Sequence, residues 1–584
     1  MAMPPALSNR DVADIFLEIA DRMEILGEDR FRVLAYRRAG EAIADLPMPL
    51  ADYRARGALE EIPGIGKTIA EKIGVILDTG TLPLAERLRA EVPDGVLDIL
   101  RVPDLGPMRA GRLYRELGIA SLEDLRLAVE DGRLRTLKGF GPKSEERIRQ
   151  GLAALHGGEQ RTLLGPALAT AELLLTELRA ALPTVPRLAY TGSLRRGRPT
   201  VGDIDLLAAA EDTAAVTAAF VALPQVARVL GQGEVKASVL LHSGLRADLL
   251  VAAPERWGSA LQHFTGSKEH NIHLRRLAQE RGYSFSEQGF ACPDGSLITC
   301  ATEEEVYATL GLPWIPPELR EDAGEFEAAA AGRLPDLIPP EALLADLHMH
   351  SRWSDGRATI ADMAAAAAAR GLRYIAITDH SAYLGLTGGL DAARLREQAA
   401  EVAAVNAEWA ARGSSFRVLH GVEVDITPDG SLALPDEALA MLDLVVASLH
   451  VSLRQPREHI TARLLRAIAN PHVDIIGHPT GRILNRRPGA DLDMEAVFRA
   501  AAEHGAILEI NSGPERLDLD AAHVRRALEL GVDLAINSDA HHPDELGWTR
   551  LGVLTARRGW APAARVVNTW PAERLLARLQ RRGT

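Results

Sequence analysis

Two aspartates separated by a single residue are the first groups in this sequence that could act together chemically. Asp203 and Asp205 lie between a glycine-containing turn and the apolar run 206–210. If this segment forms a strand, both carboxylates point to the same face, because residues two apart in a strand point the same way. Two converged carboxylates repel each other unless a divalent cation lies between them, and Mg²⁺ favours such oxygen ligands. The pair therefore predicts a metal site on a sheet.

The turn before these aspartates carries groups suited to phosphate. Gly192 and Ser193 offer backbone N–H groups and a hydroxyl, and Arg195 and Arg196 offer guanidinium groups. A metal site and a polyphosphate-binding turn on one hairpin favour nucleotidyl transfer. Because Asp-x-Asp alone is more often an exposed hairpin, the inference depends on the complete segment 192–205.

That complete segment, Gly-Ser-x-x-Arg followed by Gly-Asp-x-Asp, resembles the nucleotidyltransferase signature of DNA polymerase beta and its X-family relatives. Segment 263–271 is similar to the X-family stretch that packs against the incoming sugar and base. The resemblance implies two Mg²⁺ or Mn²⁺ ions at a catalytic site of Asp203, Asp205 and a third carboxylate, Asp248, on a neighbouring strand. It also implies a nucleotide site of Gly192, Ser193, Arg196, Phe264, Gly266 and Asn271, with Arg275 reaching the template and Lys236 contacting DNA.

A short motif occurs three times in the N-terminal quarter of the chain. Residues 62–67, 102–107 and 137–142 share the pattern apolar-x-x-apolar-Gly between two helical segments. This pattern resembles the helix-hairpin-helix motif, in which a helix N-terminus presents N–H groups to a DNA phosphate without reading the base sequence. Asp104 replaces glycine in the second copy, and its charge opposes phosphate binding there. The implied DNA contacts are Gly64, Gly66, Lys67, Gly106, Gly139, Gly141 and Lys143, with a monovalent cation held at the motifs.

The first copy also resembles the small lyase domain of DNA polymerase beta. Lys72 aligns with that family's Schiff-base lysine, and Tyr36 aligns with a tyrosine that lines the pocket. Phe31 and Thr68 stand where the relative has His and Lys, although a Schiff-base lysine is helped by neighbouring cations. Two roles therefore stay open for Lys72, abasic-site lyase nucleophile and contact to a DNA phosphate.

From residue 345 onward, seven apolar runs each end in polar residues, as expected for repeated βα units. In a β/α barrel, residues at the C-terminal ends of the strands meet on one face. So many nitrogen and oxygen ligands, without cysteine, exceed the needs of one ion and suit two or three Mn²⁺, Zn²⁺ or Fe²⁺ ions. The residues predicted to meet are His348, His350, Asp355, His380, Glu423, His450, His478, Asp539 and His541.

This set of residues resembles the ligand set of the PHP (polymerase and histidinol phosphatase) family, with a counterpart at all nine positions. The resemblance implies phosphoester cleavage by metal-activated water, which here means trimming of 3′ ends as a 3′–5′ exonuclease. Action as a 3′-phosphatase or abasic endonuclease stays open beside it.

The order of these segments resembles that of bacterial and archaeal X-family DNA polymerases with a C-terminal PHP domain, which fill short gaps in base excision repair. The fold expected is multidomain, with all-α N-terminal domains, an α+β nucleotidyltransferase palm and a distorted β/α barrel. The expected domains are 1–80 (lyase-like), 81–155 (fingers-type), 156–250 (palm), 251–315 (thumb-type), 316–340 (linker) and 341–584 (PHP barrel).

Composition limits the partners. A net charge of −14 argues against a generally basic DNA-binding surface, so DNA contacts must come from local patches and backbone amides. No apolar run approaches membrane-spanning length. Cys292 and Cys300 could form only one disulfide, which is too few to stabilise a chain of 584 residues. We expect a cytoplasmic monomer that acts on gapped or primer–template DNA and dNTPs and contacts no membrane.

Two alternatives stay open. The barrel could be a small-molecule phosphatase, with the N-terminal half acting as a DNA-binding adaptor. The chain could instead be a scaffold at DNA gaps whose chemistry is slow or absent. The two complete sets of metal ligands argue against both alternatives.

Overall fold

The computed structural model describes residues 9–44, 46, 50–62, 64–102, 105–137, 139–157, 161–384 and 388–580. Asp104, the acidic replacement in the second repeat, lies outside these residues. The chain forms two compact units, which meet in sequence at Gln160 and Arg161. No helix within the described ranges combines the length and the apolar character needed to span a membrane.

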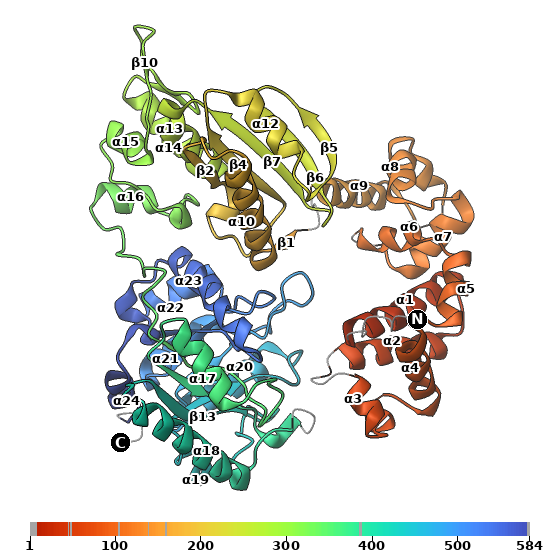
Figure 1. The fold of residues 1–584 in the computed structure, drawn as a ribbon. Helices are drawn as coiled ribbons and strands as arrows, with labels where there is room; N and C mark the ends of the chain where they lie inside the picture. The colour runs from red at the N-terminus through yellow and green to blue at the C-terminus, as the bar shows by residue number, and fades with distance from the viewer. Residues whose placement is uncertain are drawn as a thin grey trace. The chain divides into compact units, whose positions relative to one another are not determined.

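Every secondary-structure element described in the first unit is an α-helix or a 3-10 turn (Figure 1). Its first two helices, α1 (Asn9–Leu26) and α2 (Arg30–Ala44), confirm the helical spacing of the apolar residues. Phe16 and Ile19 on α1 are fully buried, and the Phe16 ring lies 5.9 Å from that of Tyr36. The other described helices are α3 (Leu50–Ala55), α4 (Lys67–Thr79), α5 (Pro83–Glu91), α6 (Asp94–Asp98), α7 (Pro107–Leu117), α8 (Leu122–Glu130) and α9 (Pro142–Gly157), with the 3-10 turns η1 (Leu59–Glu61), η2 (Ile99–Arg101) and η3 (Arg133–Thr136).

The three repeats fold alike. In each repeat the second apolar residue is buried, and its backbone N–H donates to the carbonyl of the first apolar residue. A glycine then precedes the next helix, and for α4 and α7 no side chain caps the first N–H groups. The bonded pairs are Ile65 to Ile62 (2.9 Å), Leu105 to Val102 (3.1 Å) and Phe140 to Leu137 (3.1 Å).

The second unit begins with a five-stranded sheet in the order β2-β4-β7-β6-β5. Strand β4 pairs antiparallel with β2 and parallel with β7. The turn between β2 and β4 contains a helical turn, α11 (Gly192–Arg195), and a short strand, β3 (Thr200–Val201), that pairs with β1 (Thr162–Leu163). Helix α10 (Leu164–Ala181) contributes buried leucines to the core under this sheet. The strands are β2 (Arg187–Tyr190), β4 (Asp203–Ala209), β5 (Val226–Gln232), β6 (Lys236–Leu241) and β7 (Arg246–Ala252), and helix α12 (Thr213–Val221) connects β4 to β5.

The next segment contains a small antiparallel sheet in the order β10-β9-β8 and several helices. Residues 316–340, predicted to be a linker, are instead packed structure. Leu319, Phe326 and Leu337 join one hydrophobic cluster with Cys300 and residues of α14. Proline and alanine richness suggested a linker, but the apolar side chains between the prolines have a surface to bury against. The elements are η4 (Pro254–Arg256), α13 (Trp257–Thr265), α14 (Lys268–Glu280), β8 (Ser284–Ser286), β9 (Gly289–Ala291), β10 (Leu297–Ile298), α15 (Glu303–Thr309), η5 (Pro317–Leu319) and α16 (Glu325–Ala330).

The C-terminal part is a seven-stranded parallel sheet in which the strands follow sequence order, as the seven apolar runs predicted. The sheet curves into a nearly closed barrel, because Met349 forms a parallel bridge to Ala540 and the N–H of Asp539 donates to the carbonyl of His348 (2.9 Å). The strands are β11 (Ala345–Asp346), β12 (Tyr374–Ile377), β13 (Arg417–Asp425), β14 (Leu444–Ser448), β15 (Ile475–Gly477), β16 (Ile507–Asn511) and β17 (Leu534–Asn537).

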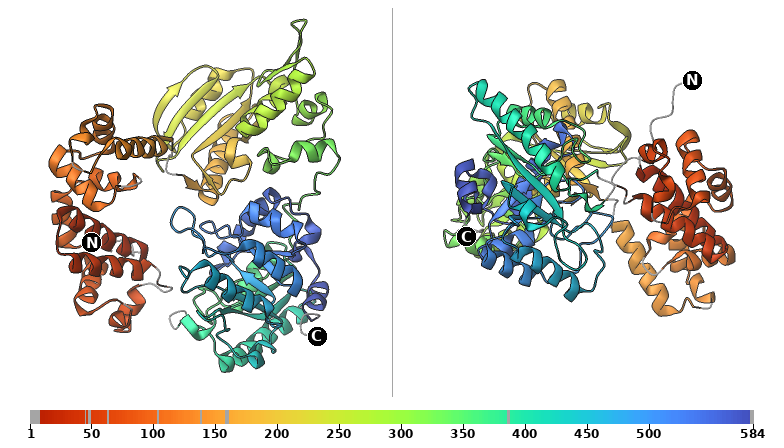
Figure 2. Two further views of the ribbon diagram at one scale, coloured as in Figure 1. Left: turned by 180° about the vertical axis from the view of Figure 1, so that it is seen from behind. Right: turned by 90° about the horizontal axis from the view of Figure 1, so that it is seen from below.

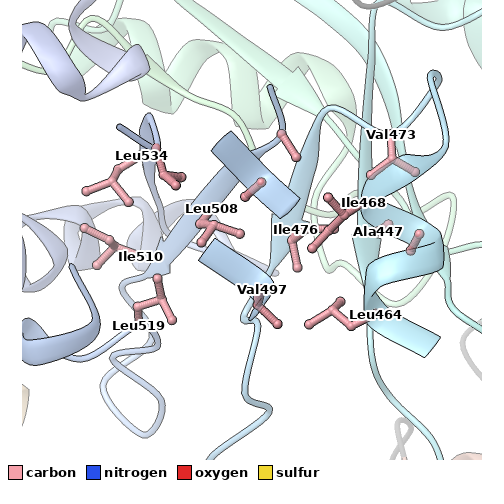
Figure 3. Packing of buried hydrophobic residues seen from close by; sticks show 14 of the residues in the cluster. Ala447, Leu464, Ile468, Val473, Ile476, Val497, Leu508, Ile510, Leu519 and Leu534 are labelled. Atoms are coloured by element: carbon pink, nitrogen blue, oxygen red, sulfur yellow. The ribbon is translucent and has the colours of Figure 1, made fainter. Parts of the chain in front are cut away.

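Helices surround these strands (Figures 1 and 2). Leu464 and Ile468 of α20 and Val497 of α21 direct their side chains at Ile476 and Leu508 of the sheet (Figure 3). Both sides of each strand are therefore covered, which explains why the runs are continuously apolar. The helices are α17 (Ile360–Ala369), η6 (Ala382–Leu384), α18 (Ala392–Ala411), α19 (Asp436–Leu439), α20 (Arg457–Ala469), α21 (Met494–His504), α22 (Ala521–Glu529), η7 (Pro543–Trp548), α23 (Thr549–Arg558), η8 (Ala563–Arg565), η9 (Val567–Thr569) and α24 (Ala572–Gln580).

Candidate active sites

The first candidate site lies on two neighbouring strands of the palm. Asp203 and Asp205 are both on β4, and Asp205 is paired in register with Asp248 on the parallel strand β7. The structure thus brings together the three carboxylates that the sequence singled out. Burial, with Asp203 and Asp248 adding to it, raises the pKa of Asp205 to about 7. A divalent cation bound among these oxygens would relieve that repulsion, so the donor set fits a hard cation.

Gly192 shows why the turn beside these carboxylates needs glycine. Its φ of +62° lies in the left-handed region, and a Cβ on this residue would lie 2.3 Å from Oδ2 of Asp205. The backbone of the turn therefore approaches the carboxylate more closely than any side chain would permit.

Two cations face the third carboxylate. Arg246 donates to both oxygens of Asp248, at 2.9 and 2.8 Å, and Nζ of Lys236 lies 3.3 Å from Oδ2. Although burial acts in the opposite direction, these cations and the Ser238 hydroxyl lower the pKa of Asp248. Asp248 is consequently ionised over a wider pH range than Asp205. Lys236, the first residue of β6, is more than half exposed.

The two arginines of the turn have different surroundings. Arg195 forms a bidentate ion pair with Glu303, at 2.7 and 2.8 Å, and donates to the Thr265 hydroxyl. Its guanidinium is therefore engaged by the protein, which makes it a poorer phosphate ligand than the sequence suggested. Arg196 pairs with Glu321 through Nε (3.1 Å) and donates to the Thr265 carbonyl through Nη1 (2.6 Å). Ser193 is partly exposed at the start of this turn.

The remaining nucleotide-site candidates lie at the α13–α14 junction. Gly266 ends α13 with a φ of +70°, and a Cβ there would lie 3.1 Å from Nη1 of Arg196. Phe264 is partly buried beside Arg196's partner Thr265, and the side chain of Asn271 donates to the carbonyl of His263 (2.7 Å). Arg275 is exposed on α14, and its Nε donates to the carbonyl of Asn271 (3.1 Å). Gly266 thus lies next to Arg196 of the palm turn, and Phe264 and Asn271 lie on the two helices that flank this glycine.

The second candidate site lies at the C-terminal ends of the barrel strands. All nine predicted residues meet there. Eight of them form three overlapping groups whose ligand atoms lie within 4.8 Å of one another, and Nε2 of His478 lies 3.0 Å from Oε1 of Glu423. The three groups are His350, Asp355, His380 and His541; His348, His350 and Asp539; and His380, Glu423 and His450.

Glu423 is the centre of this cluster. It is fully buried, and His380, His450 and His478 approach its two oxygens at 2.9, 3.2 and 3.0 Å. Burial opposes its ionisation, but His450, His348 and His380 together hold the pKa of Glu423 well below its usual range. Conversely, burial opposes protonation of His450, yet Glu423 and Asp425 raise the pKa of His450 to about 9.

Several buried atoms of the cluster have no hydrogen-bond partner among the described residues. An unsatisfied buried polar atom costs about 1–3 kcal/mol, so native proteins rarely keep one without a reason. Metal coordination would satisfy these atoms, and imidazole with carboxylate is the donor set that Mn²⁺, Zn²⁺ and Fe²⁺ accept. The donors therefore fit metal ions. The atoms are Nε2 of His348, Nδ1 of His350 and Nδ1 of His478, while Nδ1 of His380 and Oε2 of Glu423 face each other at 2.9 Å without the geometry of a hydrogen bond.

Sequence reasoning missed the residues that orient these ligands. Glu509 accepts from Nδ1 of His348 (2.8 Å), and Asp425 pairs with Nδ1 of His450 (2.8 Å). Such partners set the tautomer and the direction of a metal-binding imidazole. Glu509 ends an apolar run, and Asp425 lies two residues after Glu423, so strand alternation could have indicated both. Glu303 and Glu321 of the palm site carried no comparable signal.

The candidate DNA-binding residues of the first unit lie at the hairpin turns. Gly66 and Gly106 precede α4 and α7, Gly64 and Gly139 have φ of +89° and +93°, and Gly141 precedes α9. Lys67 and Lys143 are exposed in the first turns of α4 and α9. The ammonium of Lys72 lies 5.6 Å from the centre of the buried Tyr36 ring, and Phe31 is 82% exposed.

Comparison with known proteins decides the family. The chain is 40% identical over 565 residues to "DNA polymerase/3′-5′ exonuclease PolX" of Bacillus subtilis (strain 168), covering 96% of this chain and 97% of that protein. The chain belongs to the PolX family of X-family DNA polymerases with a C-terminal PHP domain. Family models match this PolX chain in four places: a helix-hairpin-helix domain (residues 7–82), a SAM-like helix-hairpin-helix tandem (96–154), the DNA polymerase beta thumb (260–321) and the PHP domain (346–513).

Two further relatives each match one part of this PolX chain. Rat DNA polymerase lambda is 25% identical over 351 residues, 54% of this chain and 58% of that protein. A probable phosphatase of Thermoanaerobacter sp. (strain X514) is 34% identical over 223 residues, 35% of this chain and 82% of that protein. Both the polymerase and the PHP families depend on metal ions, and the palm and barrel of this chain each contain a matching cluster of ligands.

Proposed function

We propose that this chain is a DNA-directed DNA polymerase that fills short gaps during DNA repair and trims 3′ ends with its barrel as a 3′–5′ exonuclease. One observation carries the proposal. A single chain contains three converged carboxylates beside a phosphate-binding turn and, separately, a buried cluster of nine nitrogen and oxygen ligands.

In the palm, Asp203, Asp205 and Asp248 hold two Mg²⁺ or Mn²⁺ ions. When bound, these ions lower the pKa of the primer 3′-hydroxyl and neutralise charge on the triphosphate. Ser193 and Arg196 bind the phosphates, and the close approach of Gly192 to Asp205 keeps the triphosphate next to the carboxylates. Phe264 and Gly266 pack against the sugar and base, and Asn271 faces the nucleotide.

In the barrel, the nine residues around Glu423 hold two or three Mn²⁺, Zn²⁺ or Fe²⁺ ions. When bound, the ions activate water for attack on a phosphodiester and neutralise the charge that develops on the phosphate. Glu509 and Asp425 keep His348 and His450 in the tautomer that binds metal through Nε2. Their hydrogen bonds also keep these two rings directed into the cluster.

In the first unit, the hairpin residues at Gly64, Gly66, Lys67, Gly106, Gly139, Gly141 and Lys143 bind DNA phosphates, with a monovalent cation at the turns. Lys236 and Arg275 extend the contact to primer–template DNA. Lys72 keeps two candidate roles, lyase nucleophile and phosphate contact. We propose that the protein acts as a monomer in the cytoplasm, with domains 1–80, 81–155, 156–250, 251–340 and 341–584.

One gel assay tests this function. The substrate is a 5′-labelled primer facing a one-nucleotide gap with Mn²⁺, with and without dNTPs, and the proteins are wild type, Asp205→Ala and His350→Ala. We expect extension to be lost only in Asp205→Ala and shortening only in His350→Ala. A wild type that neither extends nor shortens the primer, but hydrolyses nitrophenyl phosphate, would favour the small-molecule phosphatase instead.

A further inference from the structure

Helix α23 of the barrel supports the palm turn that carries Ser193 and Arg196. Leu551 of α23 is 2% exposed and belongs to the hydrophobic core of the palm. Gly197, at the end of the turn, lies directly on the same helix, because a Cβ there would be 3.3 Å from Cβ of Leu554 and 3.6 Å from Cδ of Arg558. The phosphate-binding turn is therefore packed between its own sheet and a helix of the barrel.

Arg558 makes the polar part of this contact. Its Nη1 donates to the backbone carbonyl of Arg196 (2.7 Å) and pairs with Oε1 of Glu321 (2.9 Å). The same oxygen of Glu321 accepts from Nε of Arg196 (3.1 Å). One carboxylate thus links a barrel arginine to a palm arginine. The side chain of Arg558 is only 8% exposed, so the three charged groups interact with little screening by water.

These contacts orient the guanidinium of Arg196. Glu321 holds Nε and the Thr265 carbonyl holds Nη1, and among the described residues no hydrogen bond is made from Nη2. Nη2 is then the nitrogen left to reach a phosphate. A side chain that is ordered before binding loses less entropy when its ligand arrives. Removal of Arg558 would free the Arg196 carbonyl and leave Glu321 with Arg196 and the more distant, 44% exposed Arg198 (3.7 Å), which loosens this arrangement.

We propose that Arg558 is a positioning residue for nucleotide binding, by which a helix of the barrel sets the affinity of the palm for dNTPs. This inference rests on the proposed contact of Arg196 with the triphosphate. Helix α23 follows η7 and the ligands Asp539 and His541 in the chain, so the helix that supports the nucleotide site is also adjacent in sequence to the barrel cluster.

The test is steady-state gap filling by the full-length chain with Mg²⁺ and varied dNTP. For Arg558→Ala we expect the KM for dNTP to rise roughly 5- to 20-fold with kcat within about twofold, because ground-state orientation is lost and the carboxylates are untouched. Arg558→Lys should recover most of the affinity, since a single nitrogen makes both contacts and an ammonium can replace it.

Arg550→Ala is the matched control. Arg550 also lies on α23 and pairs with the palm residue Glu172 (3.0 Å), but both side chains are about half exposed, at 50% and 46%. Loss of this pair should leave the KM unchanged. Shortening of the primer should be the same in all these variants, which shows that the barrel is folded.

Three results would overturn the inference. The first is a wild-type KM in Arg558→Ala while Arg196→Ala raises the KM, which leaves the proposed function intact. The second is an equal rise of the KM in Arg558→Ala and Arg550→Ala, which would mean that docking of the barrel matters and Arg558 does not.

The third applies if thermal melting shows that Arg558→Ala is unfolded. Glu321→Gln, which keeps the shape and removes the charge, then replaces it, and an unchanged KM in that variant overturns the inference. If Arg196→Ala also leaves the KM unchanged, the proposed role of Arg196 fails as well.

Discussion

The candidate palm site and the candidate barrel site, both proposed to hold cations for phosphate chemistry, differ in their electrostatics. The palm uses carboxylates only, and burial and mutual repulsion raise the pKa of Asp205 to about 7. The barrel mixes imidazoles with carboxylates, and Glu423 has a pKa well below its usual range because, despite its burial, histidines surround it. The barrel cluster is therefore largely neutralised by its own members, whereas in the palm Arg246 and Lys236 pair with Asp248 and leave Asp203 and Asp205 dependent on a bound cation.

The difference has consequences for which ion each site prefers. Oxygen-only ligands suit Mg²⁺, and nitrogen-rich sets suit transition metals. Burial differs as well, since the barrel ligands His348, His350 and Glu423 are fully buried and Asp203 is partly exposed. A buried mixed site needs partners such as Glu509 to orient its rings, while in the palm the register of two strands brings the carboxylates together.

The largest effect should come from removing a palm ligand. Asp205→Asn should lower kcat for primer extension by about 10³-fold, because loss of one ligand removes several kcal/mol of stabilisation and about 1.4 kcal/mol corresponds to tenfold. Single-nucleotide gap filling measures the loss. Shortening without dNTPs should continue at the wild-type rate. Equal loss of both activities would mean that the two sites are not independent.

The second largest effect should come from exchange of the metal ions, which should affect extension and shortening differently. After treatment with a chelator, Mg²⁺ alone should restore extension, while shortening should stay about 100-fold lower until Mn²⁺ is added, because Mg²⁺ binds imidazole poorly. Both activities are followed on the same labelled primer. Recovery of shortening with Mg²⁺ alone would contradict the assignment of a nitrogen-rich site.

A positioning partner in the barrel should have a smaller effect. Glu509→Gln should lower shortening by about 10- to 100-fold and raise the Mn²⁺ concentration that it requires, because His348 loses the carboxylate that orients it. Extension should not change. The control is Glu529→Gln, an exposed glutamate of α22 that pairs with Arg526 at the surface (2.9 Å). A wild-type Mn²⁺ requirement in Glu509→Gln would show that Glu509 does not position the ligand.

The smallest effect should be the pH dependence of metal binding. The metal concentration that each activity requires should change about tenfold per pH unit. Because the pKa of Asp205 is raised to about 7, a cation must displace a proton below pH 7, so the Mg²⁺ requirement for extension should rise as the pH falls and level off above pH 7. Burial opposes protonation of His450, but Glu423 and Asp425 raise the pKa of this ring to about 9. His450 must therefore lose a proton before it can bind a metal ion. The Mn²⁺ requirement for shortening should therefore fall until about pH 9.

Metal titrations of the two activities between pH 6 and 9.5, in steps of about half a unit, would give both profiles. The shared substrate serves as the control, because any effect of pH on DNA binding changes both activities alike. If the two metal requirements levelled off at the same pH, the contrast between the sites would be lost.

Much of the fold could be predicted because its signals are local. The apolar run after Asp203 and Asp205 indicated a strand, the seven apolar runs indicated a parallel barrel, and the repeated glycines indicated three like hairpins. The prediction of a linker at 316–340 was wrong. Proline content describes the backbone locally, whereas the burial of Phe326 depends on residues that lie far away in sequence.

By itself, the sequence determined which chemical groups are present and which strand end or turn carries each of them. Only the tertiary structure decided how those groups pair. Glu321 lies 125 residues from Arg196, and Arg558 lies 237 residues from Glu321, yet one carboxylate joins all three. The physical reason is that strand and helix periodicity are properties of neighbouring residues, whereas a hydrogen bond of about 3 Å between distant segments depends on the packing of every element between them.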